Sequence, residues 1–317
     1  MCIRDRLLNS LTRQTNKNFE VLVVEDGSSV PCKEVVDNYA DRLDICYYFK
    51  SNSGPGQTRN YGAERGHGEY LIILDSDCIL PEGYLAAVES ELQQQKADAF
   101  GGPDRAHDSF TNIQKAINYA MTSFFTTGGI RGGKKKMDKF YPRSFNMGVR
   151  AEVYKALGGF SKMRFGEDID FSIRIFQGGY ACRLFPEAWV WHKRRTDLKK
   201  FFKQVHNSGI ARINLYKKYP KSLKVVHLLP ALFTIGIVFL LLYSLVCSWS
   251  LSLLLLFALI ICVDSTLRNK SFKIGLLSIL ASFIQLIGYG TGFLRAWWKR
   301  CVLGKNEFAA FEKNFYK

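Results

Sequence analysis

Short apolar runs separated by polar turns mark the first 80 residues of the chain. Phe19–Glu25 is almost continuously apolar and is followed by Asp26-Gly-Ser-Ser29, which predicts a buried parallel strand and a turn. A helix over about Cys32–Arg42, a second strand over Ile45–Lys50 and a third over Glu69–Leu74 are expected next. Strands and helices that alternate through short turns predict an α/β protein with a doubly wound sheet.

Acidic side chains follow two of these strands. Asp26 comes after the first strand and Asp75-Ser-Asp77 after the third, and a turn over Asn52–Gly56 and a helix with Arg59 lie between them. Doubly wound sheets bind ligands beyond the carboxyl ends of their strands. We therefore expect these carboxylates to lie at one edge of the sheet.

The middle of the chain is less regular. Its predicted elements are a helix over 109–126, a loop over 126–133, a strand over 144–150, a helix that ends at Gly158-Gly159, an amphipathic helix over 166–176, strands over 180–185 and 188–192, and a basic amphipathic helix over Asp197–Tyr219. Because long apolar segments follow, we expect the basic helix to lie on a membrane surface.

Uncharged segments dominate the C-terminal third. Val225–Val263 contains no Asp, Glu, Lys or Arg in 39 residues, and a single helix of that length would run roughly 58 Å, about twice a ~30 Å hydrocarbon core. Two membrane helices that turn near Cys247–Ser250 are therefore predicted, the second of them short. A third uncharged segment, Ile274–Leu294, either crosses the membrane or takes a re-entrant path, because four glycines weaken its helix. Three crossings are favoured.

The net charge of +16 is confined to the second half of the chain. Residues 1–192 hold 24 basic and 24 acidic side chains, whereas residues 193–224 hold 11 basic and one acidic, and residues 225–317 nine and three. This distribution argues against a nucleic-acid-binding domain, and no nucleic-acid partner is expected. The positive-inside rule predicts a multi-pass protein of the inner membrane whose N-terminal domain is cytoplasmic. The expected domains are 1–222, a membrane region over 223–296 and a basic tail over 297–317.

Each acidic motif taken alone has an ordinary explanation. Asp75 and Asp77 are hard oxygen donors at one spot, which suits Mg²⁺ or Mn²⁺, but a solvated turn has the same pattern. Asp26 alone is typical of a turn, and Glu167-Asp168 alone of a helix cap. The eight cysteines show no metal-binding spacing and are interpreted as small buried hydrophobic residues.

Together, the ordered motifs are more specific. Asp26-Gly-Ser-Ser, Asn52-Ser-Gly-Pro-Gly-Gln-Thr-Arg-Asn60, Asp75-Ser-Asp77 and Gly166-Glu-Asp168 resemble the inverting family 2 glycosyltransferases with the GT-A fold, over about 7–219. Pro230 and Tyr289-Gly-Thr-Gly-Phe293 make the chain most similar to the succinoglycan-biosynthesis branch. The fold implied is a GT-A domain, a Rossmann-like doubly wound mixed sheet, followed by transmembrane helices.

The resemblance also implies roles for single residues. It places Asp26 at the nucleotide base, Arg59 at the nucleotide, Asp75 at the ribose or donor sugar, Glu167 in the substrate site, Asp77 on a divalent metal that bridges the diphosphate, and Asp168 as the general base. The donor would be a nucleotide-diphosphate sugar and the cofactor Mg²⁺ or Mn²⁺. His192 is either a further metal ligand or an ordinary half-buried histidine, and Lys134–Lys136 either clamp phosphate or form a solvated loop.

The chain departs from the family at its start. The usual Pro-x-Tyr/Asn segment of the first strand is absent, and residues 1–6 match no expected element. We therefore expect these residues to be non-native and an upstream strand to be missing.

The expected function is sugar transfer to a hydroxyl of a lipid-linked or saccharide acceptor in exopolysaccharide or cell-envelope synthesis. A polyprenyl-phosphate sugar synthase is the close alternative, and a non-catalytic membrane scaffold a more distant one. A nucleotidyltransferase would usually show a Gly-rich phosphate loop followed by Arg near its first strand, and this chain has none. A processive synthase would usually have Gln-x-x-Arg-Trp where this chain has Gln204-Val-His-Asn-Ser208, so single addition is favoured.

Overall fold

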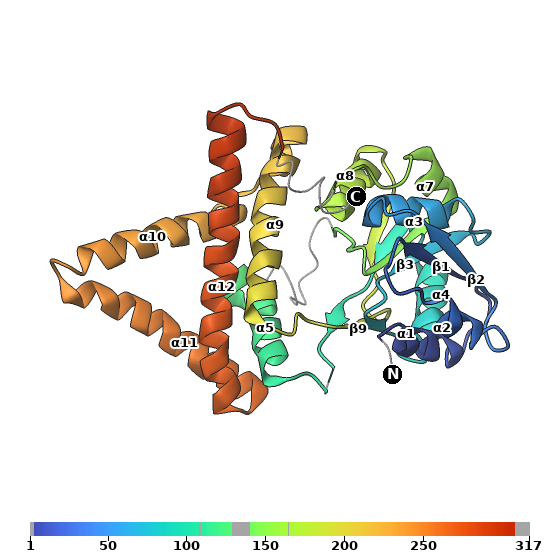
Figure 1. Cartoon of the computed structure of the whole chain (residues 1–317), viewed down its shortest axis with the longest axis horizontal. Coiled ribbons are helices and arrows are strands. Elements are labelled where there is room, and N and C mark those ends of the chain that lie inside the picture. Colours follow the sequence, from blue (N-terminus) through green and yellow to red (C-terminus); the bar gives the residue numbers. More distant parts are fainter. Residues whose placement is uncertain (1–2, 108, 129–139, 164, 308–317) are drawn as a thin grey trace. The chain divides into compact units, whose positions relative to one another are not determined.

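The computed structural model describes residues 3–107, 109–128, 140–163 and 165–307 (Figure 1). These residues form two compact units, the first with residues 3–105 and 140–193 and the second with 106–128 and 194–307. The units do not follow the expected boundaries near residues 222 and 296. The reason is that helices over 112–122 and 198–218 pack against the last apolar helix of the chain.

The first half of the first unit alternates helices and strands. In chain order these are α1 (Ile3–Thr12), β1 (Val21–Asp26), α2 (Lys33–Asp37), β2 (Ile45–Lys50), α3 (Pro55–Ala63), β3 (Tyr70–Leu74), β4 (Cys78–Ile79) and α4 (Tyr84–Gln94). The three predicted strands are confirmed to within two residues, and α2 is shorter than expected. The expectation that residues 1–6 fit no element is wrong for residues 3–6, which form the first turn of α1.

The second half of the first unit adds shorter elements. They are β5 (Ala99–Gly101), β6 (Asp104–Arg105), β7 (Asn146–Arg150), α7 (Ala151–Ala156), α8 (Glu167–Gln177), β8 (Cys182–Leu184) and β9 (Val190–His192). The strands predicted over 144–150, 180–185 and 188–192 are thus present, each shorter than expected.

Hydrogen bonds divide the described strands into three sheets. β1 and β2 form a parallel pair in which Asp26 lies opposite Lys50. β3, β7, β5 and β8 form a mixed sheet in that order, and β4, β9 and β6 form a small third sheet. The carboxyl end of β3 and the start of β4 are only three residues apart, so the turn between them joins two sheets.

In the mixed sheet, a large aromatic side chain packs over a glycine of the neighbouring strand. Phe100 on β5 lies opposite Gly148 on β7, where an added Cβ would come 2.0 Å from the Phe100 ring. The Phe100 ring also stacks on Phe185 at 4.6 Å. Only glycine leaves room for this ring, so the pair fixes the register of β5 on β7.

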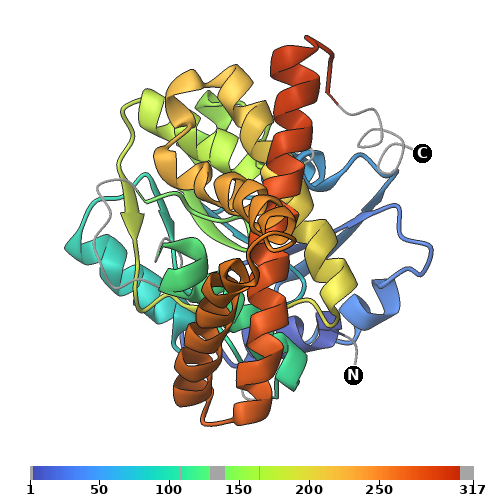
Figure 2. The same ribbon diagram turned by 90° about the vertical axis from the view of Figure 1, so that its left-hand side faces the viewer.

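The second unit is helical. It contains α5 (Asn112–Thr122), α6 (Phe124–Thr127), α9 (Leu198–Lys218), α10 (Leu229–Tyr243), α11 (Ser252–Asn269) and α12 (Phe272–Trp297). The helix predicted over 109–126 starts later because Thr111 and Gln114 form a capping box, and it breaks at Ser123. α12 lies beside α9 and α5, while α10 and α11 lead away from α12 and meet at the turn over 244–251 (Figures 1 and 2).

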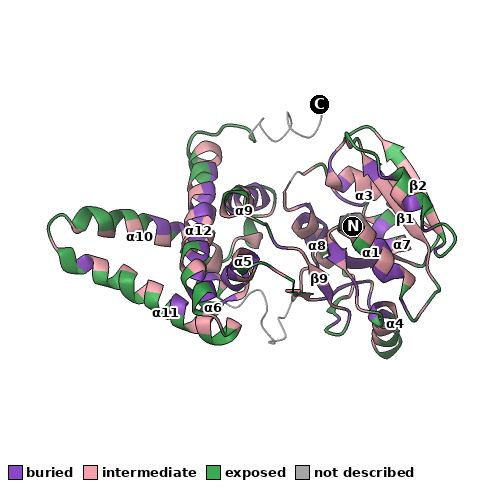
Figure 3. Ribbon diagram, turned by 60° about the horizontal axis from the view of Figure 1, so that its bottom comes forward, coloured by how far each residue is buried: buried purple, intermediate pink, exposed green. Residues whose placement is uncertain are grey.

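The apolar face of α9 is covered by protein, so its apolar pattern reflects packing against neighbouring helices. Buried residues such as Phe201 and Val205 pack with α5 and α12, whereas α10 and α11 expose about half of their residues (Figure 3). The glycines of α12 do not interrupt its helix. They lie at its contacts with neighbouring helices, where they permit close approach.

Two apolar helices of the described residues, Ser248–Asn269 and Phe272–Val302, have the length and composition needed to cross a membrane. α10 is apolar too, but it has only 15 residues. The uncharged segment over 225–263 forms two helices that turn near residue 247, as predicted, although the second helix is the longer one.

Candidate active site

The turn between β3 and β4 brings Asp77 to His192. Cys78 on β4 pairs with His192 on β9, so the residue before Cys78 lies beside the imidazole. Asp77 Oδ1 is 3.3 Å from His192 Nε2, and the imidazole stacks on Phe145 at 4.5 Å. The backbone N–H of Cys78 donates to the Asp75 carbonyl at 3.0 Å and closes the turn. Strand pairing therefore joins two residues that lie more than a hundred positions apart.

This pair has the geometry of two ligands of one divalent cation. Donor atoms in neighbouring octahedral positions about 2.0–2.1 Å from Mg²⁺ lie roughly 3 Å apart, close to the observed separation. Cys78 Sγ is near as well. However, burial and then the charges of Asp75 and Asp77 raise the pKa of the Cys78 thiol, which keeps it protonated. Asp77 and His192 thus fit a metal better than Cys78 does.

Arg59 on α3 connects Asp75, the other carboxylate of the β3–β4 turn, to Glu167 on α8. Its guanidinium donates to Asp75 at 3.0 Å and to Glu167 at 2.9 Å. The Arg59 and Glu167 side chains are 15% and 10% exposed, so water screens this ion pair weakly. The fork geometry of arginine holds both carboxylates at once. Three residues from three sequence motifs therefore meet in one cluster.

Asp168 lies next to this cluster, in the first turn of α8. Gly166 precedes the helix at φ 83°, a left-handed conformation that favours glycine. Arg143 lies 3.6 Å from the Asp168 carboxylate. Burial, followed by the negative charge of Asp168, raises the pKa of Glu167 to about 7. Glu167 is therefore protonated much more readily than an ordinary glutamate, in spite of its contact with Arg59.

Asp26 has a different environment from the other acids. Its carboxylate accepts hydrogen bonds from Lys50 Nζ at 2.7 Å and from the backbone N–H groups of Ser53 and Gly54 at 2.8 and 2.9 Å. Burial would raise the pKa of Asp26, but Lys50 and these N–H groups lower it. Asp26 thus holds the turn after β2 at the carboxyl edge of the parallel pair.

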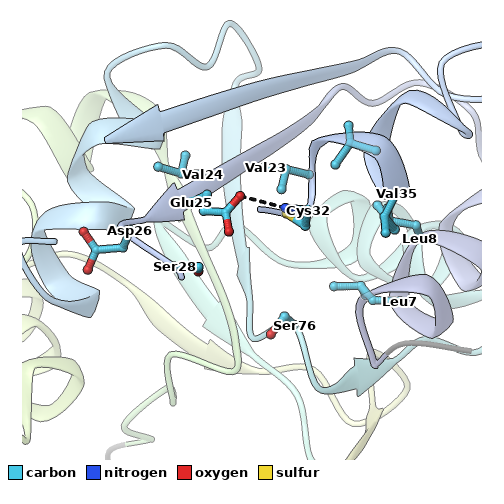
Figure 4. Close-up of a pocket in the computed structure, with 11 residues that line it drawn as sticks. Leu7, Leu8, Val23, Val24, Glu25, Asp26, Ser28, Cys32, Val35 and Ser76 are labelled. Carbon is cyan, nitrogen blue, oxygen red and sulfur yellow. Dashed lines mark hydrogen bonds between the residues drawn. The ribbon is translucent and has the colours of Figure 1, made fainter. Parts of the chain in front are cut away.

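A cavity of about 280 Å³ opens beside Asp26 (Figure 4). Asp26, Ser28 and Ser76 contribute polar groups to its wall, and Leu7, Val23 and Val35 are among its apolar lining residues. Ser76 comes from the turn that carries Asp75 and Asp77, so the cavity adjoins that turn. An apolar cavity with a few polar groups is typical of a small-molecule site.

Glu25 forms part of the same wall. Burial would raise its pKa, but hydrogen bonds from the Tyr47 hydroxyl and the Cys32 backbone N–H outweigh burial and lower it to about 2. Glu25 is therefore charged at every physiological pH, and it fixes the segment over 28–32 against β2.

The chain is similar to known glycosyltransferases in sequence and in fold. Residues 5–158 match the family model "Glycosyl transferase family 2". The mannosyltransferase PcManGT from Pyrobaculum calidifontis, solved with GDP-Man and Mn²⁺, is similar at a TM-score of 0.61. That similarity covers 90% of this chain and 83% of that chain at 17% identity. The chain has a GT-A-like glycosyltransferase fold.

The curated proteins that the chain resembles are also named glycosyltransferases. Glycosyltransferase AglE from Haloferax volcanii is 26% identical over 70% of this chain and 75% of that protein. The probable glycosyltransferase YdaM from Bacillus subtilis is 26% identical over 59% of this chain. An uncharacterized glycosyltransferase from Rickettsia felis is 29% identical over 38% of it. The chain spans 46% of the Bacillus protein and 19% of the Rickettsia protein.

Sequence reasoning missed two cations of the site. Lys50 could have been found, because β1 and β2 are equally long parallel strands and their last residues lie opposite each other. Arg143 lies outside every motif, and only the fold brings it to Asp168. Lys134–Lys136, expected to be a phosphate clamp or a solvated loop, lie outside the described residues.

Proposed function

We propose that this protein is a metal-dependent, inverting glycosyltransferase that moves a sugar from a nucleotide-diphosphate sugar to an acceptor hydroxyl. The observation that carries the proposal is the β3–β4 turn. One of its carboxylates, Asp77, faces His192, and the other, Asp75, is tied through Arg59 to the Glu167-Asp168 pair. This arrangement supports a metal site at Asp77 and His192 and a general base at Asp168.

Asp77 and His192 would hold Mg²⁺ or Mn²⁺, which would neutralise the charge that develops on the diphosphate leaving group. Arg59 holds Asp75 in place and remains protonated, because Asp75 and Glu167 raise its pKa against the opposing effect of burial. Asp75 is left partly exposed, at the position where a sugar or ribose hydroxyl could donate to it.

Asp168 is the proposed general base. Its side chain is 15% exposed and lies in the first turn of α8, next to the cluster of Arg59, Asp75 and Glu167. A single base that activates one acceptor hydroxyl for one displacement inverts the anomeric carbon. Arg143, 3.6 Å away, orients the Asp168 carboxylate.

The cavity beside Asp26 is proposed to take the nucleotide base. Its apolar wall suits the faces of a planar ring, while Asp26, Ser28 and Ser76 offer hydrogen bonds at one end. The connection through Ser76 to the β3–β4 turn would place the attached diphosphate next to Asp77.

The acceptor is proposed to be a lipid-linked or saccharide hydroxyl at the cytoplasmic face of the inner membrane, in exopolysaccharide or cell-envelope synthesis. The exposed apolar side chains of α10 and α11 support membrane attachment, and the basic segment over 193–224 supports the cytoplasmic side. The same apolar helices favour a polyprenyl phosphate as the second candidate acceptor.

A donor panel tests the proposal. Full-length protein in native membranes is given each common nucleotide-diphosphate sugar with Mg²⁺ or Mn²⁺, and release of nucleoside diphosphate and labelled product is measured. We expect one donor to be turned over in a metal-dependent way. A product that organic solvent extracts and mild acid cleaves would identify the polyprenyl-phosphate acceptor. Turnover of no donor, or equal turnover by the Asp168→Asn variant, would contradict the proposal.

A further inference from the structure

The helical hairpin of α10 and α11 presents an apolar tip. Leu245, Val246 and Trp249 in its turn are 84%, 86% and 81% exposed. No charged residue occurs between Val225 and Val263, which covers the turn and most of both helices. Exposed apolar surface on this scale is unusual for a soluble protein and marks an interaction site.

Many polar groups of the turn form hydrogen bonds within the hairpin. The backbone N–H groups of residues 244–247 and 250 all donate to carbonyl oxygens within 240–247. The Ser244 hydroxyl donates to the Leu241 carbonyl, and the Ser252 hydroxyl to the Trp249 carbonyl, both at 2.6 Å. Hydrocarbon tolerates backbone only where its hydrogen bonds are made internally. These groups of the tip meet that condition.

The hairpin is too short to reach across a bilayer. α10 approaches the backbone of α12 at Thr234, because a Cβ added to Gly290 would lie 2.1 Å from the Thr234 hydroxyl. α11 approaches α12 at Cys262, which lies next to Gly275. From these contacts each helix extends about 15 Å to the turn. With the turn added, the tip stands roughly 20 Å from α12, against ~30 Å of hydrocarbon.

α12 is not free to cross the bilayer in place of the hairpin, because α9 runs beside it. An added Cβ on Gly292 would lie 2.0 Å from the His206 carbonyl oxygen, and one on Gly209 would lie 2.2 Å from the Tyr289 carbonyl oxygen. α9 has six cationic residues and no acidic ones: Lys199, Lys200, Lys203, Arg212, Lys217 and Lys218. A spanning α12 would carry these cations into hydrocarbon, which is strongly unfavourable.

Charged groups lie at the base of the hairpin and not at its tip. Asp264 on α11 accepts a hydrogen bond from the Tyr119 hydroxyl at 2.7 Å and pairs with Arg268 at 3.0 Å. Basic residues also flank all three apolar helices, at 217–224 before α10, at 268–273 between α11 and α12, and at 295–305 after α12. The positive-inside rule places all three clusters on the same side.

We propose that α10 and α11 insert together into one leaflet of the bilayer and return to the side they entered from. α12 then lies with α9 at the headgroup level and does not cross. The partner of the hairpin tip is lipid hydrocarbon, and that of the basic clusters is anionic headgroups. The proposal rests on the membrane attachment in the proposed function, and it replaces the three crossings favoured by the sequence.

Labelling of thiols in the full-length chain, with its native cysteines kept, tests the topology. Lys273→Cys and Asn306→Cys report on the two ends of α12, Cys247 reports on the tip, and exposed Cys46 marks the side of the first unit. An impermeant maleimide is added to intact cells or to inside-out vesicles, and mass spectrometry identifies the labelled peptides. We expect Cys46 and both introduced cysteines to react only in the vesicles, and Cys247 to react only after detergent.

Other labelling patterns overturn the proposal. Asn306→Cys labelled in intact cells would show that α12 crosses, and Cys247 labelled in intact cells would show that the hairpin does. Cys247 labelled in vesicles without detergent would show that the tip is not in lipid. Donor turnover in detergent is measured in parallel, so that a failure of the proposed chemistry is separated from a failure of the topology.

A charge at the tip gives a second, independent measurement. Leu245→Asp should increase release from membranes by alkaline carbonate at least several-fold, whereas Val30→Asp, which alters a 76% exposed residue of the first unit, should not. Nucleotide release by the solubilised fraction shows that the variant is folded. Equal retention of the two variants would overturn insertion of the tip.

Discussion

Single residues of the site are positioned by strand register more than by neighbours in sequence. Asp26 and Lys50 are the last paired residues of two parallel strands, and Cys78 opposite His192 brings Asp77 to the imidazole. Each charged group therefore gains a partner whose place is fixed by backbone hydrogen bonds. Substitutions at these positions should alter chemistry with little effect on the fold.

Asp77→Ala should lower sugar transfer by at least 100-fold, because it removes a proposed ligand of the ion that neutralises the leaving group. His192→Ala should weaken Mn²⁺ binding in the absence of donor, as measured by titration calorimetry. Asp41→Asn, at a side chain 78% exposed, serves as the control. Full activity of the unsubstituted protein in excess EDTA would rule out the metal.

Asp168→Asn should reduce turnover by roughly 100-fold or more while donor affinity is kept, because the amide retains the shape but accepts no proton. It also removes a negative charge next to Glu167, so the pKa of Glu167, now raised to about 7, should fall. Difference infrared spectroscopy over pH 4–8 would follow the Glu167 carboxyl. A collapse of donor affinity would instead place Asp168 in the nucleotide site.

The stability of the folded protein depends on pH through Glu25. Its pKa is about 2 in the folded chain against an ordinary 4.5, so the stabilisation it provides is complete above pH 4.5 and is lost as pH falls towards 2. Glu25→Gln should destabilise the protein by about 2 kcal/mol at pH 7, from the loss of charge-assisted hydrogen bonds. Unfolding in detergent at several pH values should show this difference shrinking below pH 4.5. A difference that stays constant with pH would contradict the assignment.

Helix elements of the second unit depend on glycines for their spacing. Gly209 on α9 and Gly292 on α12 lie where a Cβ would overlap a backbone oxygen of the facing helix. The glycines that would weaken an isolated helix thus allow α9 and α12 to pack closely.

Gly292→Ala should destabilise the second unit by about 1–3 kcal/mol, because the added methyl group must push two backbones apart. Gly236→Ala on α10 is the matched control, since nothing lies within 4 Å of its Cβ position, and it should be neutral or slightly stabilising. Thermal unfolding in detergent measures both. Equal effects of the two variants would show that α9 and α12 are not in close contact.

For the whole molecule, the uneven distribution of charge predicts how it binds membranes. The first 192 residues are neutral and the remainder carries the full excess of +16. Vesicles with anionic lipid should therefore bind the full-length protein more tightly than neutral vesicles at low salt. The difference should vanish near 1 M salt, where the Debye length is about 3 Å, while binding through the apolar hairpin persists. Flotation assays at several salt concentrations would measure this, and complete release at high salt would contradict the hairpin contribution.

The sequence alone determined the features that depend on local pattern. Apolar runs bounded by turn residues located β1, β2 and β3, because a buried strand must be apolar along its length. The order of the acidic motifs indicated the fold now found. The absence of charge over 225–263 located the hairpin and its turn.

Tertiary structure decided what depends on contacts between distant segments. Pairing of β4 with β9 brought His192 to Asp77, and no local signal separated that histidine from an ordinary one. Packing of α9 along α12 gave the amphipathic helix a protein partner where a lipid surface was expected. Hydropathy records how apolar a helix is, but not which surface covers it. The same apolar stripe fits a bilayer or another helix, and only the facing glycines and carbonyl oxygens of α9 and α12 distinguish the two.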